Sequence, residues 1–319
     1  MPQFWDYTTV FNSVLKSPGM RRAMEADHPG KKLTPQLFYA DQVDFFAQRG
    51  LKGESEQGFM EWLWITNNRP YYNIYPSILP ILTRLRLTLD AGLIKVPMPV
   101  LNIRLPKGNP IAFDFDGKHY EMRTLMLSGA GMEVILGGKA GIQANTDKLK
   151  GVSIWMDFGE EEARSAGVPV LSYENLPCTS GRTLEEEIEG TPRHRSAGLG
   201  VQLPQEIIND CVRLCCTLCL LESDPAIIEP DVLNDDREKW EKTGDPKFVE
   251  RAKKRGKFGW NVGAKLQVIP HYRSASPAAL YWTGPGRAIP KIRFRRATIV
   301  HREQVEKLPE GHLGPLPED

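Results

Sequence analysis

The segment from Arg251 to Arg302 contains no aspartate and no glutamate, although the whole chain has 40 acidic residues. It carries thirteen of the 41 basic residues, so the rest of the chain holds 28 basic residues against 40 acidic ones. The formal net charge of +1 hides this division. Because like charges repel one another, such a segment is normally kept where an anionic partner binds it. Nucleic acid, an acidic protein and a phosphate-rich surface such as the ribosome are the candidates.

The sequence also lacks any uninterrupted apolar run of the roughly 20 residues that a membrane span needs, so we expect no membrane partner. Its first residues, Met-Pro-Gln-Phe-Trp-Asp-Tyr, contain no basic region followed by an apolar one. We therefore expect no secretion signal and a cytoplasmic protein. Hydrophobic residues make up 41% of the chain and charged residues 25%, which is typical of globular proteins and argues against global disorder.

Cysteine is scarce, and its spacing does not match a metal site. Four of the five cysteines lie within nine residues: Cys211, Cys215, Cys216 and Cys219. A structural zinc site would have two separated C-x-x-C pairs or a nearby histidine, and neither is present here. Gly137 to Gly141 likewise does not match a nucleotide-binding fingerprint. We expect no metal and no cofactor, and we interpret the four thiols as small core residues in a reducing compartment.

The hydrophobic patterning predicts an α+β fold. Apolar residues recur at three- and four-residue spacing over Pro35–Arg49, Glu54–Asn67 and Pro76–Ile94, which predicts helices there. Short β-rich runs predict strands over Val100–Leu105, Ile111–Phe115, His119–Met126, Met132–Leu136, Ser153–Phe158 and Pro169–Tyr173.

Two short signals refine this pattern. Asp116-Gly117 is a hairpin turn sequence between two of the predicted strands. Thr183-Leu-Glu-Glu186 has the capping-box spacing of a helix start. Pro204–Leu221 is the most apolar helix candidate, so we place it at the centre of the fold.

Three regions follow from this reading, and together they could form one compact domain. They are a helical N-terminal part over 1–95, a central antiparallel β-rich part over 96–200, and a part over 201–319. The last joins the apolar central helix to a basic, β-containing C-terminal segment. Within it, the charged stretch 231–257 is expected to be a mobile insertion.

The basic tail is predicted to contain strands near Leu266–Tyr272 and over Lys291–Val300. In the second strand, alternation places Lys291, Arg293 and Arg295 on one face, opposite Ile292 and Phe294. The sequence therefore predicts a basic strand on an apolar support.

This tail also holds the densest set of residue types that bind anions and bases. Arginine recognises phosphate with a planar fork, tyrosine and tryptophan stack on unpaired bases, and glycines let the backbone approach a ligand. The candidate binding residues are His271, Arg273, Tyr281, Trp282, Gly284, Gly286, Arg287, Lys291, Arg293 and Arg295.

A structural interpretation of these residues is also open. Gly-Pro-Gly over 284–286 is a good turn, the aromatic pair before it can pack on the core, and His271 can be a hydrogen-bonded structural residue. His271 is the only catalytic candidate, and no second general acid or base accompanies it.

Two motifs carry a family resemblance. One is Pro270-His271-Tyr272-Arg273 leading into Tyr281-Trp282-Thr283-Gly284-Pro285-Gly286 and a basic strand. The other is Leu218-Cys219-Leu220-Leu221-Glu222 followed by Asp224-Pro225. In these segments the chain resembles the second type V-A anti-CRISPR family and its relatives on phages, plasmids and bacterial chromosomes.

The resemblance implies a regulator rather than a conventional enzyme. The family's named member lowers production of the type V-A CRISPR nuclease by acting on its message during translation and recognising the nascent N-terminal peptide. Relatives commonly continue Pro-His-x-Arg with Arg-Gly-His-Trp, whereas this chain has Ser274 to Leu280 there. The missing second histidine favours binding over catalysis.

The leading hypothesis is therefore a regulatory protein that binds RNA, or a ribosome with its nascent polypeptide, and suppresses expression of a target. One alternative is an RNA-acting enzyme, either an RNase or a nucleotide-dependent transferase, that uses His271 and Arg273. The other is a protein-only inhibitor whose basic surface covers an acidic protein target.

Overall fold

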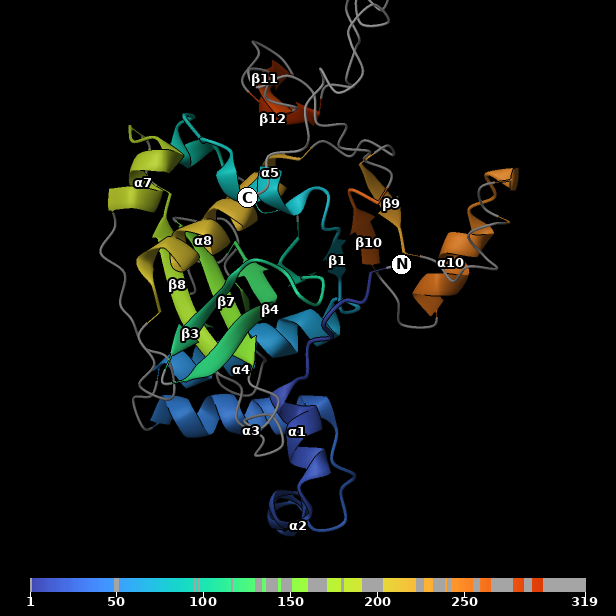
Figure 1. The fold of residues 1–319 in the computed structure, drawn as a ribbon. Coiled ribbons are helices and arrows are strands. Elements are labelled where there is room, and N and C mark those ends of the chain that lie inside the picture. Colours follow the sequence, from blue (N-terminus) through green and yellow to red (C-terminus); the bar gives the residue numbers. More distant parts are fainter. Residues whose placement is uncertain are drawn as a thin grey trace, which may run out of the picture.

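A computed structural model describes most of the chain up to Ala264 and two strands beyond it (Figure 1). The described residues are 2–48, 52–94, 96, 98–115, 117–129, 134–135, 143–144, 151–159, 171–178, 181–190, 203–221, 227–231, 239, 242–254, 259–264, 278–283 and 289–294. Within them the chain forms an α+β fold around a mixed sheet, as the patterning predicts.

In this described part the sheet has eight strands, in the order β8-β7-β4-β2-β1-β10-β9, and β3 pairs with β4 beside this path. The strands are β1 Tyr71–Ile74, β2 Val100–Arg104, β3 Ala112–Phe115, β4 Lys118–Ser128, β7 Gly151–Gly159, β8 Leu171–Pro177, β9 Ile228–Pro230 and β10 Gly259–Val262. β1 lies parallel to both β2 and β10, and the other pairs are antiparallel. The sheet thus takes strands from all three regions of the sequence.

Two strand pairs lie outside this sheet: β5 Val134–Ile135 with β6 Gln143–Ala144, and β11 Ala278–Thr283 with β12 Ile289–Phe294. The described helices are α1 Val10–Lys16, α2 Pro18–Asp27, α3 Pro35–Gln48, α4 Lys52–Thr66, α5 Leu79–Arg84, α7 Leu184–Gly190, α8 Gln205–Leu220 and α10 Lys247–Lys254, with a 3₁₀ turn η1 over Ala91–Leu93. None of these helices is long and apolar enough to span a membrane.

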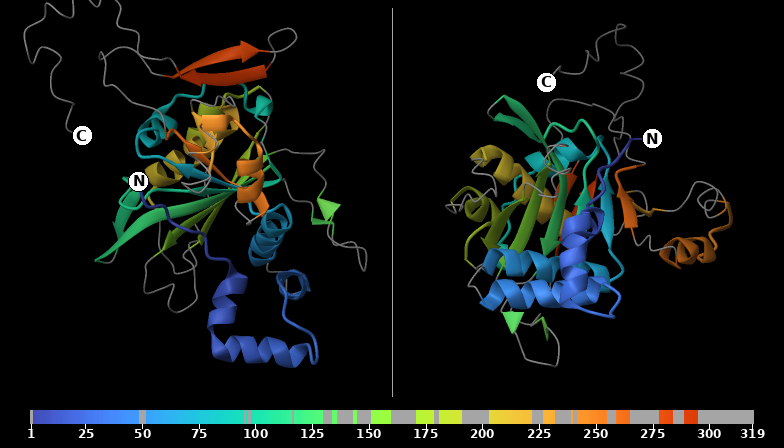
Figure 2. Two further views of the ribbon diagram at one scale, coloured as in Figure 1. Left: turned by 90° about the vertical axis from the view of Figure 1, so that its right-hand side faces the viewer. Right: turned by 90° about the horizontal axis from the view of Figure 1, so that it is seen from below.

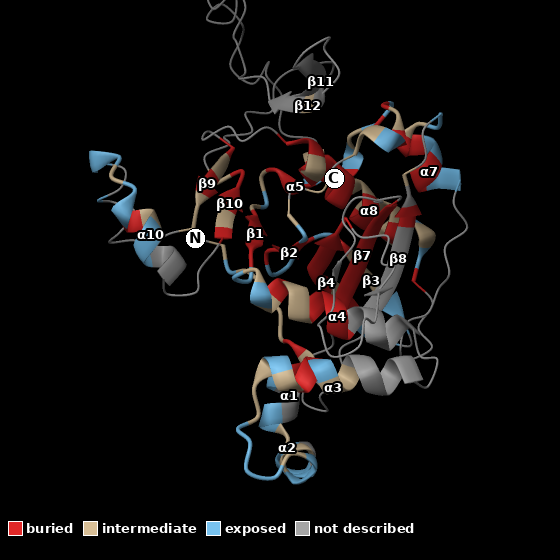
Figure 3. Cartoon of the chain, turned by 180° about the vertical axis from the view of Figure 1, so that it is seen from behind, coloured by how far each residue is buried: buried red, intermediate tan, exposed pale blue. Residues whose placement is uncertain are grey.

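One face of the sheet packs against α5 and α8 (Figures 1 and 2). Leu101, Leu125 and Ile154 from three adjacent strands meet buried residues of α8 in the main apolar core. Cys211, Cys215 and Cys216 are buried there and Cys219 is half-buried, which confirms the core interpretation of this cysteine-rich helix. Figure 3 shows this buried interior running through the strands and α8.

The opposite face of the sheet is covered by α4, with α3 packed outside it (Figure 1). Met60 and Trp64 of α4 contact Met126 and Trp155 of the sheet. The buried Glu61 carboxylate on the same helix accepts hydrogen bonds from the Tyr7 and Tyr39 hydroxyls. Burial, with the Glu61 charge, raises the pKa of both tyrosines far above their usual range. These phenols therefore stay neutral, and they join the N-terminal segment, through Tyr7, and α3, through Tyr39, to Glu61 of α4.

The local signals of the sequence are confirmed where the structure describes them. β3 and β4 form the predicted hairpin, with Phe115 opposite Lys118 and Gly117 at a φ of 71°, a conformation that favours glycine. The Thr183 amide donates to the Glu186 carboxylate at 2.7 Å, and the Glu186 amide donates to the Thr183 hydroxyl at 3.2 Å. This reciprocal pair is the predicted capping box at the start of α7.

The predicted helix over Pro76–Ile94 is wrong in most of its length. Within this range only Leu79–Arg84 and the 3₁₀ turn are helical, and the residues between them are irregular. The Leu184 amide donates to the Leu89 carbonyl at 2.8 Å, and the Glu185 amide donates to the Leu87 carbonyl at 3.0 Å. Pairing with this distant segment satisfies the backbone and buries both leucines, which overrides the helical spacing.

Candidate nucleic-acid interface

The basic hairpin β11–β12 carries the predicted binding residues that the structure places. Tyr281 lies opposite Lys291, and Ala279 lies opposite Arg293. Since strand positions alternate between faces and directly opposite residues share one, Tyr281 and the two cations occupy positions of one face. Trp282, opposite Pro290, occupies a position of the other face.

β12 partly confirms the strand predicted over Lys291–Val300, because it begins at Ile289 and is described to Phe294. The other predicted binding residues lie outside the described residues: His271, Arg273, Gly284, Gly286, Arg287 and Arg295. The strand predicted near Leu266–Tyr272 lies outside them as well.

The hairpin lies outside the layers of the main sheet, beside the α8 layer (Figures 1 and 2). β12 contacts α8, the apolar helix of the core, and Lys291 is half-buried. A basic strand is thus mounted over the core helix whose cysteine-rich end carries the second sequence motif. The division of β12 into a basic face and an apolar face stays a prediction.

A second feature lies at the β9 edge of the sheet. An insertion leaves the sheet after β9 and returns to it at β10. The Asp231 amide donates to the Gly259 carbonyl at 2.8 Å, which joins the two ends of the insertion. The Tyr71 hydroxyl donates to the Asp231 carboxylate at 2.5 Å. Burial, and then the hydrogen bond to Asp231, raises the pKa of Tyr71 above its usual range, so the phenol keeps its proton.

The Tyr71 ring itself is held on both sides. The Arg104 guanidinium carbon lies 3.8 Å from the ring centre, and the guanidinium pairs with Asp6 at 2.8 Å. On the neighbouring strand, a β-carbon added at Gly259 would lie 2.1 Å from Cζ of the ring. Only a residue without a side chain fits there, so Gly259 and Tyr71 fix each other's place.

Sequence reasoning missed this polar contact region because its members come from distant segments. The Asn73 side chain donates to the Asn261 side-chain oxygen at 2.9 Å, across 188 positions of sequence. One signal was present: Tyr72-Asn73-Ile74 and Trp260-Asn261-Val262 share the order aromatic, asparagine, aliphatic. The parallel register of β1 and β10 aligns these two triplets residue by residue.

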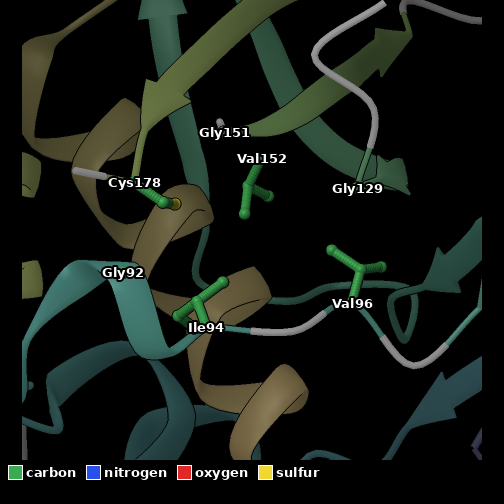
Figure 4. A pocket seen from close by; sticks show the side chains of 7 residues that line it. All are labelled: Gly92, Ile94, Val96, Gly129, Gly151, Val152 and Cys178. Atoms are coloured by element: carbon green, nitrogen blue, oxygen red, sulfur yellow. The ribbon is translucent and has the colours of Figure 1, made fainter. Parts of the chain in front are cut away.

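A small pocket between η1 and the ends of β4, β7 and β8 offers no reactive group (Figure 4). It is lined by Gly92, Ile94, Val96, Gly129, Gly151, Val152 and Cys178. Burial, with a smaller effect of the Glu187 charge, raises the pKa of the Cys178 thiol to about 11. At neutral pH the thiol is therefore protonated and a weak nucleophile. Among the described residues, no group of three or more His, Cys, Asp or Glu could hold a metal ion.

Comparison with known proteins finds similarity among solved structures. No protein-family model matches the chain, and no curated protein sequence matches it. Among solved structures, the chain is similar to the crystal structure of AcrVA2, with a TM-score of 0.44 and 15% sequence identity, over 92% of this chain and 94% of that chain.

Proposed function

We propose that this chain is an anti-CRISPR-like regulatory protein that binds RNA, or a translating ribosome with its nascent chain, and thereby suppresses expression of a target protein. The observation that carries the proposal is the basic face of β12. Lys291 and Arg293 occupy neighbouring positions of one strand face, within a segment that contains no acidic residue. Such a face attracts phosphates, and its own sequence offers no carboxylate to neutralise it.

The chemistry of this face suits a nucleic acid. Side chains two positions apart on a strand begin about 7 Å from one another, so each cation can meet its own phosphate. Lysine supplies a point charge and arginine a planar fork, and both contact phosphate oxygens without reading sequence. Tyr281, at the position opposite Lys291, supplies an aromatic ring of the kind on which an unpaired base stacks.

The motifs of the tail support the regulatory part of the proposal. The segments Pro270–Arg273 and Tyr281–Gly286 and the basic strand resemble the anti-CRISPR family whose named member acts during translation. The absence of a second histidine between Arg273 and Tyr281 favours a protein that binds RNA over one that cuts it.

Charge reversal on β12 tests the RNA-binding step. The variant Lys291→Glu with Arg293→Glu should weaken binding of a labelled RNA by about tenfold or more and flatten its salt dependence, because phosphate contacts are lost. Fluorescence anisotropy at several salt concentrations measures both quantities. The matched control reverses two exposed lysines elsewhere, Lys31→Glu with Lys32→Glu, and should bind as the wild type does.

Wild-type binding that is insensitive to salt, or a β12 variant that binds normally, would contradict the proposal. Co-sedimentation with translating ribosomes, with and without nuclease, tests the ribosomal context. Recovery of a protein partner that survives nuclease treatment, together with no RNA binding, would favour an inhibitor of an acidic protein instead.

A further inference from the structure

The insertion between β9 and β10 carries the basic helix α10 away from the body of the protein. In Figure 1 and in the right-hand view of Figure 2, α10 stands beyond the β9 edge of the sheet, outside the layers formed by the other helices. Figure 3 shows exposed residues along it. The position of this insertion in the sequence agrees with the charged stretch predicted over 231–257, whose mobility stays a prediction.

The base of this insertion is built into the sheet. The Asp231 amide is hydrogen-bonded to the Gly259 carbonyl at 2.8 Å, and the Asp231 carboxylate accepts from the Tyr71 hydroxyl at 2.5 Å. Beyond them, Pro230 pairs with Trp260, whose ring meets the Tyr72 ring edge to face at 5.6 Å. Both ends of the insertion therefore begin from fixed points on one sheet edge.

The helix itself is capped, and its apolar side is already covered. The Asp245 carboxylate accepts from the Lys247 amide at 3.0 Å just before the first turn. Phe248 is only 6% exposed, and the cationic groups of Lys247 and Arg251 lie 5.0 and 5.3 Å from its ring centre. The exposed side chains described on α10 are charged: Lys247, Glu250 and Arg251.

The positive charge of α10 increases toward its C-terminal end. At the first turn, the Lys247 ammonium pairs with Asp245 at 2.5 Å, and this contact, with the amide bond, lowers the pKa of Asp245. From Arg251 to Lys257 the sequence has five cations in seven residues and no acid. Arg251 and Lys254 lie three positions apart, so they occupy neighbouring positions of one helix face, whereas Lys247 is already paired with Asp245 and Glu250 lies one turn before Lys254.

We propose that α10 is a second RNA-contacting element, an arm that binds phosphates through the basic face of its last turn, where Arg251 is exposed and Lys254 follows three positions later. This inference rests on the proposed RNA binding and adds a contact region separate from β12. An acidic protein fits this face less well. The centre of a protein interface needs apolar anchors, whereas the Phe248 ring is already buried and the exposed face offers charges. Phosphate contacts need only cations.

Basic residues in the last turn of a helix also stabilise its dipole, so the test must separate binding from stability. The test variant is full-length protein with Arg251→Glu and Lys254→Glu, and its neutral counterpart carries Gln at both positions. A third variant, Arg251→Lys, keeps the charge. The probe is a labelled single-stranded RNA of about 20 nucleotides, long enough to reach more than one contact region.

We expect charge reversal to raise the RNA dissociation constant about tenfold and to reduce the salt slope by about 1.4, the value for two lost single-strand phosphate contacts. The neutral variant should show a smaller loss of the same kind, and Arg251→Lys should bind nearly as wild type. An unchanged salt slope, with only a lower melting temperature, would mean that the cations serve helix stability and would overturn the inference.

The outcomes also separate this inference from the function proposed for β12. If the β12 variant loses RNA and the α10 variant does not, the α10 inference is wrong and the proposed function stands. If the α10 variant alone loses RNA, the arm is supported and β12 is not the binding element. Wild-type protein that binds a polyglutamate peptide but no RNA would contradict both proposals.

Discussion

Two cations in the body of this protein are paired with carboxylates from other parts of the fold, whereas the acid-free segment has no carboxylate in its own sequence. In the body, Arg213 lies 2.5 Å from Glu185 and donates to the Thr83 carbonyl, and Arg104 pairs with Asp6. Each of these cations has a carboxylate supplied by another part of the fold. Between Arg251 and Arg302 the sequence supplies thirteen cations and no carboxylate. The comparison teaches that a cation paired within the fold contributes to stability, whereas cations gathered in a segment whose own sequence has no acidic residue can attract an external anion.

The comparison predicts two separable sets of variants. Substitutions in the body should lower stability and leave the salt dependence of RNA binding unchanged in the folded protein. Substitutions on β12 and α10 should reduce the salt dependence of RNA binding and leave stability unchanged. Two results would contradict this division of the variants. One is a substitution in the body that reduces the salt dependence of RNA binding, and the other is a charge reversal on α10 whose main effect is to unfold the protein.

The largest loss of stability is expected at the Arg213–Glu185 pair. Replacing Glu185 with alanine leaves Arg213, whose side chain is 13% exposed, without this partner and also removes the acceptor of the Leu87 amide at 2.9 Å. Breaking a buried pair in this way costs about 3–5 kcal/mol. Urea unfolding measures the loss, and Glu189→Ala on the exposed side of the same helix is the control. Equal stability of the two variants would show that the pair adds nothing.

An intermediate loss is expected from Gly259→Ala. The new methyl group would meet the Tyr71 ring at 2.1 Å, so the ring must leave its place against Asp231 and Arg104. Overpacking of this kind costs about 1–3 kcal/mol. Gly19→Ala is the matched control, because nothing lies within 4 Å of a β-carbon there and the site is helical. The control should be neutral or slightly stabilising, and a stable Gly259→Ala would contradict the close contact.

Gly259→Ala also sharpens the comparison between the two regions. Its clash lies at the base of the α10 insertion, whereas the basic residues of α10 are untouched. We therefore expect lower stability with a normal salt slope for RNA binding. Thermal unfolding and anisotropy on the same preparation measure the two quantities.

The smallest effect is a pH dependence that arises from Glu185. Burial alone would raise the pKa of this carboxyl, but the Leu87 amide and the Arg213 guanidinium together lower it below its usual value. A carboxyl whose folded pKa is depressed contributes stability above its unfolded pKa, about 4.3, and loses it as pH falls through the folded value. The stability advantage over Glu185→Gln should therefore be constant near neutral pH and shrink below about pH 4. Urea titrations at several pH values measure it, and an advantage that grows on acidification would contradict the assignment.

The elements that the sequence predicts well are those with local causes. The hairpin at Gly117 needs only its turn residues, and the capping box at Thr183 needs only residues three positions apart. The core position of α8 follows from its apolar periodicity. In each case the deciding interaction lies within a few residues of the signal.

The elements that the sequence does not predict depend on distant partners. Leu87 and Leu89 have helical spacing, yet their carbonyls accept hydrogen bonds from the amides of 185 and 184, and the segment is not helical. β1 lies within a region that reads as helical, and its pairing with β10 joins segments almost 190 positions apart. For the candidate interface, alternation predicts which positions share a face of β12, while the place of the strand over α8 required the structure.

The parallel pairing of β1 with β10 has a consequence for the order of events during synthesis. β1 is complete when Ile74 has been added, but its partner on that side ends at Val262. Strands that must wait for such a distant segment form late, and an open strand edge is a site of mispairing. We therefore expect β1, Tyr71 and the β9–β10 edge to become ordered only after most of the chain has left the ribosome. Until then, the partly folded chain has an uncovered β1 edge, which is open to mispairing.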